Sequence, residues 1–597
     1  MGAFLQNYLQ DRTVRVCIGG TTSNIFTEAN RVSQGSVLAV TLFLISMNSV
    51  FQKLPKNIYI YVFADDIIIV VAGRSIKLTR RKAQAVAIAI EKWATSVRFT
   101  LSPTKCSITH CCNGSHRPTG TSVFLSGTNI PYAKEPRILD VTFDNKLTFL
   151  PHFRNVKSDY ESRLKLMRTI SNGHPKWNRS SAINVSKALI RSRIYYGIEA
   201  TGLRRNNLIT TLAPTYNRYI RIASNHLPST PANAACVEAG QLPFRWQTAI
   251  VIFRRALGYL EKTSGQDCML LDLAKQLHQL YTGKELPQLA RFHSARNKPW
   301  YNTNIPAIDT SLHLADLPPV AARARFHDNT NSKYKNHYHL YTDGSKTATG
   351  VGIGISGPEP ATNTSLQLPT TCSIFSTEAA TIAWSLITKP SNQPTVVFSD
   401  SLSVITALQS GNCRHPFIQA IENHSDAGVT ICWVPAHCGI QGNKTVDRLA
   451  ALGRSSALIQ HPETPAADIT KSFTNQVATR FTRHWGSSWG HTQKIKGDTT
   501  KWTDRSSRAE QRILSRLRVG HTKTTHTHTI SRADSPTCET CYTRKTVEHQ
   551  LVNCLELADL RRQHDLPPSL RDILCNDPVR EEVLLPFLKD ADLFQKV

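Results

Sequence analysis

The sequence predicts a multidomain protein that combines α/β and all-α regions. The chain has 597 residues, β-type runs alternate with helical patterns in two separate stretches, and long helical patterns lie between and after these stretches. At about 150 residues per domain, the length suggests roughly four globular units. A single compact core is therefore excluded.

The chain is strongly basic. Lys and Arg number 71 against 43 Asp and Glu, which gives a formal net charge of +28, and 40% of the residues are hydrophobic. This charge favours a polyanionic partner, first of all nucleic acid, whereas the hydrophobic content excludes a disordered basic tail. The most apolar run, residues 58–71, is too short and too charged to cross a membrane.

The first residues show none of the regions of a secretory signal peptide. We therefore expect a protein that is cytoplasmic and/or nuclear and is not secreted. In such a compartment the fourteen Cys residues are expected to be reduced thiols or metal ligands.

Residues 1–155 predict a first unit with a small sheet and a packed helix. Short β-type runs cover 14–18, 58–63 and 67–71. Over 80–97, Val86, Ile90, Trp93 and Val97 recur at the spacing of one helical face. Asp65 and Asp66 fall at a tight turn between two apolar runs, and we expect both strands to be buried, where two acids without a cation would be costly.

Three motifs in this unit resemble the palm of reverse transcriptases of the non-LTR (LINE-type) retrotransposon group. They are the segment Ser33-Gln34-Gly35-Ser36-Val37-Leu38, the segment Phe63-Ala64-Asp65-Asp66, and the segment Leu101-Ser102-Pro103-Thr104-Lys105. The resemblance implies that Asp65 and Asp66 help to hold catalytic metal ions. It also implies that Gln34 and Gly35 lie against template and incoming nucleotide, and that Lys105 is the lysine of the following motif.

A polymerase of this group needs a further metal-binding Asp in a motif of the kind D-x-x-x-A-F-D. We do not find this motif in the chain and expect a palm that is truncated at its N-terminal side. The polypeptide as written is therefore expected not to polymerise DNA alone. Activity restored by a missing N-terminal segment stays open as an alternative.

Residues 156–335 show helical patterns and then a polar, Pro-bearing stretch at 297–319, which predicts a helical thumb or connector followed by a linker. The next unit, 336–456, alternates strands and helices and predicts an α/β domain.

This α/β unit contains four acids at the ends of predicted strands or in helices. They are Asp343, Glu378, Asp400 and Asp447. Four converging carboxylates would repel one another unless cations lay between them, and hard oxygen ligands suit Mg²⁺ or Mn²⁺. Two such ions can activate a water and stabilise the leaving oxygen of a phosphodiester. Taken singly, each of these acids would more often be a solvated surface group or a helix cap than a metal ligand.

The strings around these acids resemble type 1 ribonuclease H as it occurs in retroelement polyproteins. DGSK begins at Asp343, TEAA contains Glu378, SDS contains Asp400, and WVPAHCGIQGNKTVDRLA runs over 433–450. The resemblance implies a mixed five-stranded sheet and two metal ions held by the four acids. It also implies cleavage of the RNA strand of a hybrid to leave 3′-hydroxyl and 5′-phosphate ends.

His437 lies in the loop of this motif, and the resemblance implies that it assists proton transfer or product release. The alternative is a loop histidine bonded to the backbone. Ala436 stands where the family usually has Gly, so the loop would be strained if residue 436 required a positive φ.

Residues 457–597 predict a basic helical tail with a Cys/His cluster. One helix contains Arg508, Arg512, Arg516 and Arg518, which suit phosphate contact or simply a solvated face. The spacing Cys538-x2-Cys541-x7-His549-x4-Cys554 can bring three thiolates and one imidazole around a structural Zn²⁺. It resembles clusters that follow ribonuclease H in retrotransposons; the alternative is reduced, metal-free cysteines.

Together these observations predict the C-terminal part of a non-LTR retrotransposon polyprotein that cleaves RNA in RNA–DNA hybrids. The expected partners are the hybrid, RNA, DNA and the rest of the polyprotein. A catalytically idle nucleic-acid-binding remnant is the alternative. The charge distribution fits this division, because residues 336–455 carry a net charge of −1 and the flanking regions carry +29.

Overall fold

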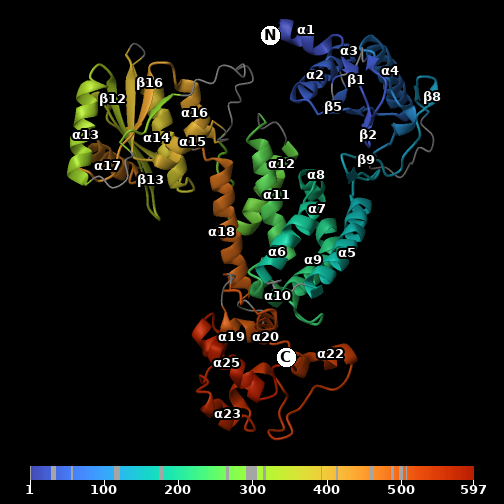
Figure 1. Ribbon diagram of the computed structural model, residues 1–597, viewed down its shortest axis with the longest axis vertical. Helices are drawn as coiled ribbons and strands as arrows, with labels where there is room; N and C mark the ends of the chain where they lie inside the picture. The colour runs from blue at the N-terminus through green and yellow to red at the C-terminus, as the bar shows by residue number, and fades with distance from the viewer. Residues whose placement is uncertain are drawn as a thin grey trace. The chain divides into compact units, whose positions relative to one another are not determined.

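The computed structural model forms two compact units, residues 1–155 and 156–597 (Figure 1). The structure describes residues 2–27, 32, 35–55, 58–112, 122–173, 179–263, 268–290, 306–312, 318–390, 393–411, 415–456, 463–485, 490–496, 500, 502–505 and 507–597. None of the helices in these ranges is long and apolar enough to span a membrane.

The first unit is built from short strands and four helices before the chain enters α5. Its elements are α1 (Gly2–Leu9), β1 (Thr13–Val14), β2 (Cys17–Ile18), β3 (Thr21–Thr22), β4 (Phe26–Thr27), α2 (Val37–Asn48), α3 (Val50–Lys53), β5 (Tyr59–Phe63), β6 (Asp66–Val70), α4 (Ile76–Ser96), a 3-10 turn (Pro103–Lys105), β7 (Phe124–Leu125), β8 (Thr128–Asn129), β9 (Arg137–Ile138) and β10 (Val141–Thr142). All its strands pair as two-stranded antiparallel sheets. The run predicted at 14–18 is therefore divided between β1 and β2.

The core of the first unit lies between α2, α3, α4 and one face of the β5–β6 hairpin. Val86, Ile90 and Trp93 of α4 are buried there, at the spacing expected of one helical face. Nε1 of Trp93 donates to Oγ of Ser49 at 2.8 Å, so the indole N–H is satisfied inside the core. Ser75 caps α4 by accepting from the Leu78 N–H.

The prediction that both strands around Asp65 and Asp66 are buried is wrong. Tyr59, Tyr61 and Phe63 are exposed on the face opposite the core, because β5 and β6 pair only with each other and α2 and α4 cover one side. Both acids are exposed as well, so their burial cannot be the reason for a cation at this turn.

The second unit begins with a helical bundle. Its helices are α5 (Leu150–Gly173, which starts in the first unit), α6 (Arg179–Ser186), a π-helical turn (Lys187–Arg191), α7 (Ser192–Ile194), α8 (Ile198–Thr201), a 3-10 turn (Gly202–Arg204), α9 (Arg205–Ala223), α10 (Ala232–Glu238), α11 (Phe244–Leu260) and α12 (Cys268–Thr282). α18 (Ala466–Trp485), which lies in the predicted tail, packs along α11 and α12. The rings of Phe253 and Phe473 stack there with centroids 3.9 Å apart.

A six-stranded mixed sheet follows the bundle. Its strands are β11 (Ala307–Asp309), β12 (Tyr338–Lys346), β13 (Val351–Ser356), β14 (Thr364–Leu368), β15 (Thr395–Ser399) and β16 (Val429–Trp433), in the order β11-β16-β15-β12-β13-β14. β12, β15, β16 and β11 run parallel to one another, and β13 pairs antiparallel with both β12 and β14. The predicted mixed sheet of five strands is present, and β11 adds a sixth from the region predicted as a linker.

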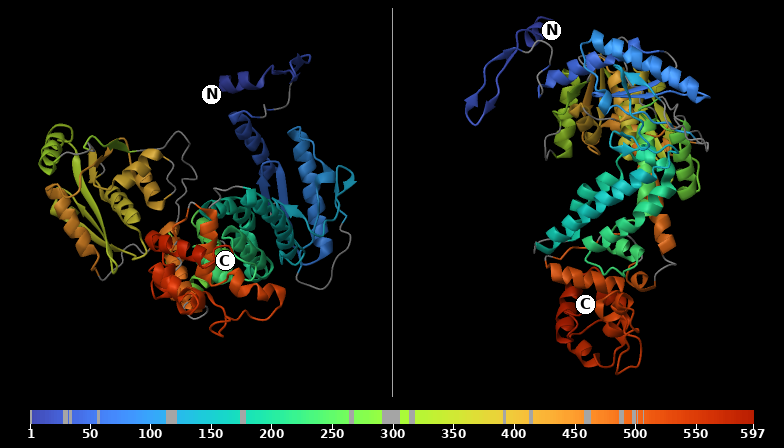
Figure 2. Two further views of the ribbon diagram at one scale, coloured as in Figure 1. Left: turned by 60° about the horizontal axis from the view of Figure 1, so that its bottom comes forward. Right: turned by 90° about the vertical axis from the view of Figure 1, so that its right-hand side faces the viewer.

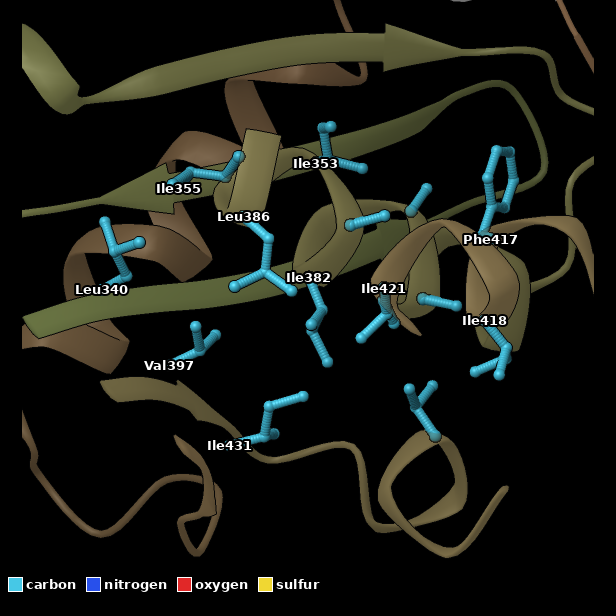
Figure 3. Close-up of a cluster of buried hydrophobic side chains, with 14 of the residues drawn as sticks. Leu340, Ile353, Ile355, Ile382, Leu386, Val397, Phe417, Ile418, Ile421 and Ile431 are labelled. Atoms are coloured by element: carbon cyan, nitrogen blue, oxygen red, sulfur yellow. The ribbon is translucent and has the colours of Figure 1, made fainter. Parts of the chain in front are cut away.

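Helices cover both faces of this sheet (Figures 1 and 2). α14 (Ile374–Thr388), α15 (Leu402–Ser410) and α16 (Pro416–His424) enclose the larger core with one face, and Leu340, Ile382, Val397 and Ile431 lie inside it (Figure 3). α13 (Pro319–Ser332) and α17 (Gln441–Gly453) cover the other face. A short 3-10 turn (Pro360–Thr362) precedes β14.

α17 approaches β13 closely because β13 carries glycine where the helix crosses it. A Cβ on Gly352 would overlap the carbonyl oxygen of Ala450, and a Cβ on Gly354 would overlap that of Val446. The alternation Gly350-Val351-Gly352-Ile353-Gly354 thus places glycines toward α17 and apolar side chains toward α14. This packing sets the position of every side chain on α17.

The C-terminal region forms a small helical core. Its elements are α19 (Gly490–Ile495), α20 (Arg508–Val519), α21 (Lys523–His526), α22 (His528–Ser531), a π-helical turn (His549–Asn553), α23 (Ala558–Gln563), α24 (Leu570–Leu574) and α25 (Pro578–Asp590). Ile513, Leu514 and Leu517 of α20 are buried against α24 and α25.

The basic helix α20 is largely committed to contacts within the protein. Arg518 is 1% exposed, pairs with Glu581 at 2.6 Å and lies over the ring of Trp502. Arg516 donates to the carbonyl oxygens of Asn225 and Val597, and Arg508 contacts Asn225. Three of the four arginines therefore have structural partners, which weakens the interpretation of α20 as a phosphate-binding face.

Candidate active site and metal centres

Three acids meet at one end of the six-stranded sheet. Asp343 lies on the central strand β12, Glu378 on α14, and Asp400 immediately after β15. One carboxylate oxygen from each lies within 4.8 Å of the others. Because β12 and β15 are parallel neighbours, the chain delivers Asp343 and Asp400 to the same edge of the sheet.

Gly344 allows α14 to reach the site. A Cβ at this position would lie 3.0 Å from the Glu378 nitrogen and 3.1 Å from its carboxyl carbon, which is tighter than ordinary contact. The Gly344 N–H donates to the carboxylates of both Asp343 and Glu378. Lys346, two residues further along β12, donates to the Thr370 and Cys372 carbonyls just before α14. Residues of the DGSK string therefore hold β12 and α14 close together at the site.

The carboxyl groups are protonated more readily than ordinary acids. Burial, followed by repulsion from Asp400 and Asp447, raises the pKa of Asp343 to about 7. Burial, followed by repulsion from Asp343 and Asp400, raises the pKa of Glu378 to about 9. Burial and Asp447 also raise the pKa of Asp400. These shifts are the signature of like charges forced together in a site of low polarity.

Asp447 and His437 border this cluster. Asp447 lies on α17, outside the group of three, but close enough to raise the pKa values of Asp343 and Asp400. Burial raises the pKa of Asp447, and His437, which is exposed in the loop between β16 and α17, opposes this rise. Its own φ is +58°, and Gly439 has φ +83°, whereas Ala436 is not among the left-handed residues. The strain anticipated at Ala436 is therefore absent.

The acid cluster fits a divalent cation. Within the described part of the chain, Oε2 of Glu378 is buried and has no hydrogen-bond partner. An oxygen in that position needs a cation or a proton, since an unpaired buried charge is costly. All-oxygen ligands of this kind are those of Mg²⁺ or Mn²⁺.

Sequence reasoning missed one side chain in this site. Asn443 lies on α17 one turn before Asp447 and is 5% exposed, and its side chain hydrogen-bonds Asp400. The four-residue spacing to Asp447 on a helix was the available signal, because residues i and i+4 share a face.

The Cys/His cluster is also assembled. Ligand atoms of Cys538, Cys541, His549 and Cys554 all lie within 4.8 Å of one another, and the sulfurs of Cys538 and Cys554 are 3.9 Å apart. The neighbouring His549 side chain, and then the Cys541 N–H, lower the pKa of Cys538 to about 6. A thiolate is therefore favoured at neutral pH, as a metal ligand requires.

The orientation of His549 fits the same purpose. Its Nδ1 lies 3.3 Å from Oγ1 of Thr543, while its Nε2 is buried without a hydrogen-bond partner among the described residues. In metal-binding histidines the second nitrogen is usually held by such a partner. The donor set and its geometry fit Zn²⁺.

The predicted polymerase residues are spread over the first unit. Gly35, with φ +96°, precedes α2, Asp65 lies in the β5–β6 turn and Asp66 begins β6, and Lys105 ends the 3-10 turn after α4. Gln34 lies outside the described residues. The structure gathers no cluster of metal-ligating side chains around Asp65 and Asp66 within the residues it describes.

Two family models match the chain. The model described as reverse transcriptase (RNA-dependent DNA polymerase) matches residues 3–145, and the RNase H model matches residues 335–455. The fold and the acid cluster thus define a protein with a ribonuclease H domain and a reverse transcriptase region.

Curated relatives carry the identification further. An RNA-directed DNA polymerase from mobile element jockey of Drosophila melanogaster is 25% identical over 33% of this chain and 22% of the relative. A putative 115 kDa protein in type-1 retrotransposable element R1DM of the same organism is 27% identical over 21% of this chain and 12% of the relative. A probable RNA-directed DNA polymerase from transposon BS of D. melanogaster is 22% identical over 36% of this chain.

These matches show that the chain is similar to non-LTR retrotransposon polyproteins and contains a reverse transcriptase region and a ribonuclease H region. The chain spans at most 25% of the length of the three relatives described.

Proposed function

We propose that the ribonuclease H domain hydrolyses the RNA strand of RNA–DNA hybrids with two bound Mg²⁺ or Mn²⁺ ions. The observation that carries the proposal is the cluster of Asp343, Glu378 and Asp400 at the edge of the sheet, with Asp447 beside it. Their raised pKa values and the unpartnered oxygen of Glu378 indicate a site made to receive cations.

The chain's own residues divide the work as follows. Asp343, Glu378, Asp400 and Asp447 would hold the ions, which when bound supply an activated water and neutralise charge on the phosphate. The Gly344 N–H and the Asn443 side chain fix the orientations of these carboxylates. His437 is exposed beside Asp447 and would assist proton transfer or product release.

The test is cleavage of an end-labelled RNA–DNA hybrid by the 597-residue chain, with Mg²⁺ and with EDTA. An RNA duplex and a DNA duplex of the same sequence serve as substrate controls. We expect metal-dependent cuts in the RNA strand of the hybrid alone. Equal cutting in EDTA, or none under either condition, would contradict the proposal, and the idle binding protein would then be the better interpretation.

Asp343→Asn supplies the residue-level prediction for this function. It removes one negative charge from the metal cluster and keeps the shape of the side chain, so we expect cleavage to fall by more than about a hundredfold. Hybrid binding, measured by fluorescence anisotropy, should remain within about threefold of the wild type, well below the tenfold that 1.4 kcal/mol represents. Cleavage retained by this variant would remove Asp343 from the proposed machinery.

For the reverse transcriptase region, we propose that Asp65 and Asp66 form the acidic turn of the palm and that residues 1–597 alone do not extend a primer. The support is that no third ligating side chain gathers at this turn among the described residues. The test is primer extension by the purified chain. Incorporation that Asp66→Asn abolishes would overturn this proposal.

A further inference from the structure

β11 and α13 belong physically to the ribonuclease H domain, although they precede the residues matched by its family model. β11 extends the sheet by pairing in parallel with β16, from Ala307 opposite Thr430 to Asp309 opposite Cys432. The Asp309 carboxylate accepts from Nζ of Lys333 at 2.8 Å and from the hydroxyl of Tyr334 at 2.5 Å. These bonds tie the strand to the end of α13.

α13 supports the loop that carries His437. Phe326 of α13 packs edge-on against Phe398 of β15, with ring centroids 5.2 Å apart. The same buried cluster contains Val434 and Ile440, the residues on either side of the loop 435–439. The helix and both ends of the His437 loop therefore share one buried cluster.

Arg323 lies on α13 three residues before Phe326, at the outer side of this loop. A Cβ placed on Gly439 would lie 3.7 Å from Nη1 and 3.8 Å from Cδ of Arg323. The guanidinium end is exposed, and it forms no ion pair with any acid in the described part of the chain. A permanently charged group is thus held two residues from His437 and available to an anion.

We propose that Arg323 is a phosphate-binding residue that holds the backbone of the hybrid at the His437 loop. The inference rests on the proposed function and adds a contact to the same site. The acid cluster attracts cations and repels the phosphates of the substrate, in a domain whose net charge is −1 over residues 336–455. A cation at the rim offsets that repulsion, and guanidinium can donate two parallel hydrogen bonds to one phosphate.

Arg325 provides a matched control on the same helix. It is exposed and carries the same charge, but two helical positions turn it about 200° away from Arg323. A non-specific attraction between α13 and nucleic acid would depend on both arginines. A contact at the His437 loop depends on Arg323 alone.

The experiment uses the full chain in the Asp343→Asn background, so that binding is measured without hydrolysis. The probe is a short RNA–DNA hybrid of about ten base pairs, titrated at several salt concentrations. We expect Arg323→Glu to weaken binding about tenfold and to lower the magnitude of the salt slope by about one. Arg325→Glu should change the dissociation constant by less than about threefold. Arg323→Lys should have an intermediate affinity, because it keeps the charge but cannot donate two parallel hydrogen bonds.

Equal effects of Arg323→Glu and Arg325→Glu, or no effect of Arg323→Glu, would overturn the inference. Thermal unfolding of both variants checks the fold. If only Arg323→Glu lowers the unfolding temperature, binding is measured with Arg323→Gln, which introduces no negative charge. In the cleaving chain, Arg323→Gln should raise KM more than it lowers kcat. If the chain cleaves no hybrid while Arg323→Glu still selectively weakens binding, the proposed function fails and this contact stands.

Discussion

The site acids show how strongly a fold can alter the chemistry of single residues. Asp343 and Glu378 have pKa values of about 7 and about 9 because they are buried beside other carboxyl groups. The sequence strings were enough to find these acids. The last string contains Asn443, whose role only its four-residue spacing to Asp447 could have indicated. The strings could not reveal Arg323, because its neighbour Gly439 is distant in sequence.

At the residue scale we also predict that zinc holds the Cys/His cluster. Cys541→Ser should lower the bound zinc from about one ion per chain to near zero at limiting metal, because three ligands bind far more weakly than four. Cys575→Ser, at a cysteine outside the cluster, should leave the zinc content unchanged. Elemental analysis of the purified proteins measures both, and zinc-free wild-type protein would refute the assignment.

At the element scale, the position of Asp447 depends on how α17 packs against β13. Gly352→Ala would overlap the backbone of α17 at Ala450, and overpacking of this kind costs about 1–3 kcal/mol. We expect a lower unfolding temperature and weaker Mg²⁺ binding by calorimetry, since the helix must shift.

The control for this change is Gly258→Ala in α11, where a Cβ meets nothing within 4 Å. Alanine in a helix is favoured over glycine by about 0.5–1 kcal/mol. This variant should therefore be slightly more stable than the wild type and bind Mg²⁺ equally well. Destabilisation of similar size in both variants would show that α17 does not require the glycine.

The junction between α11 and α18 predicts a pH effect on stability. Glu261 is buried and accepts from the Ala466 N–H at 3.0 Å; burial, with Asp468 adding repulsion, raises its pKa to about 7. The unfolded carboxyl has a pKa of about 4.3, so the folded state holds the proton more strongly. Stability from this group is present below pH about 4.3 and is lost as pH rises through about 7.

Glu261→Gln cannot ionise, and its amide keeps an oxygen that can accept from Ala466. We therefore expect the unfolding temperature of the variant, relative to the wild type, to increase between pH 5 and pH 7.5 and then to level off. Differential scanning calorimetry measures this difference. A constant difference over the range would mean that Glu261 is ionised in the folded protein.

The elements themselves were predictable where their patterns are long. The strands predicted at 58–63 and 67–71 are β5 and β6, and the helix predicted at 80–97 is α4. β11 was not predictable, because three residues carry no periodicity and their partner in the sheet lies about 120 residues later. The β5–β6 hairpin was predicted to be buried, but one of its faces is exposed. An apolar run in a sequence does not show which face of a strand will be covered by other elements.

At the scale of the whole molecule, the net positive charge lies outside the ribonuclease H region. The ribonuclease H region is close to neutral, while the remainder of the chain carries the net charge of +29. Three arginines of α20 form contacts within the protein. Nucleic-acid binding by the remaining basic residues would therefore involve other surfaces.

This separation predicts a steep salt dependence for hybrid binding by the whole chain. If six to ten phosphates are neutralised, affinity should fall by about 10³ to 10⁵ between 50 and 200 mM salt. Anisotropy titrations of the Asp343→Asn chain measure the slope. A change of less than about tenfold would show that the flanking regions take little part in binding.

The pairing of β11 with β16 also constrains the order in which the ribonuclease H domain can be completed during synthesis. β11 is translated before every other strand of its sheet, yet its only partner there is β16, the last strand to be made. Bringing β11 and β16 together closes a long loop, and the chain loses conformational entropy before the contacts between the two strands can form. The edge that supports the His437 loop therefore forms after the rest of the sheet has emerged from the ribosome, and the catalytic domain matures late.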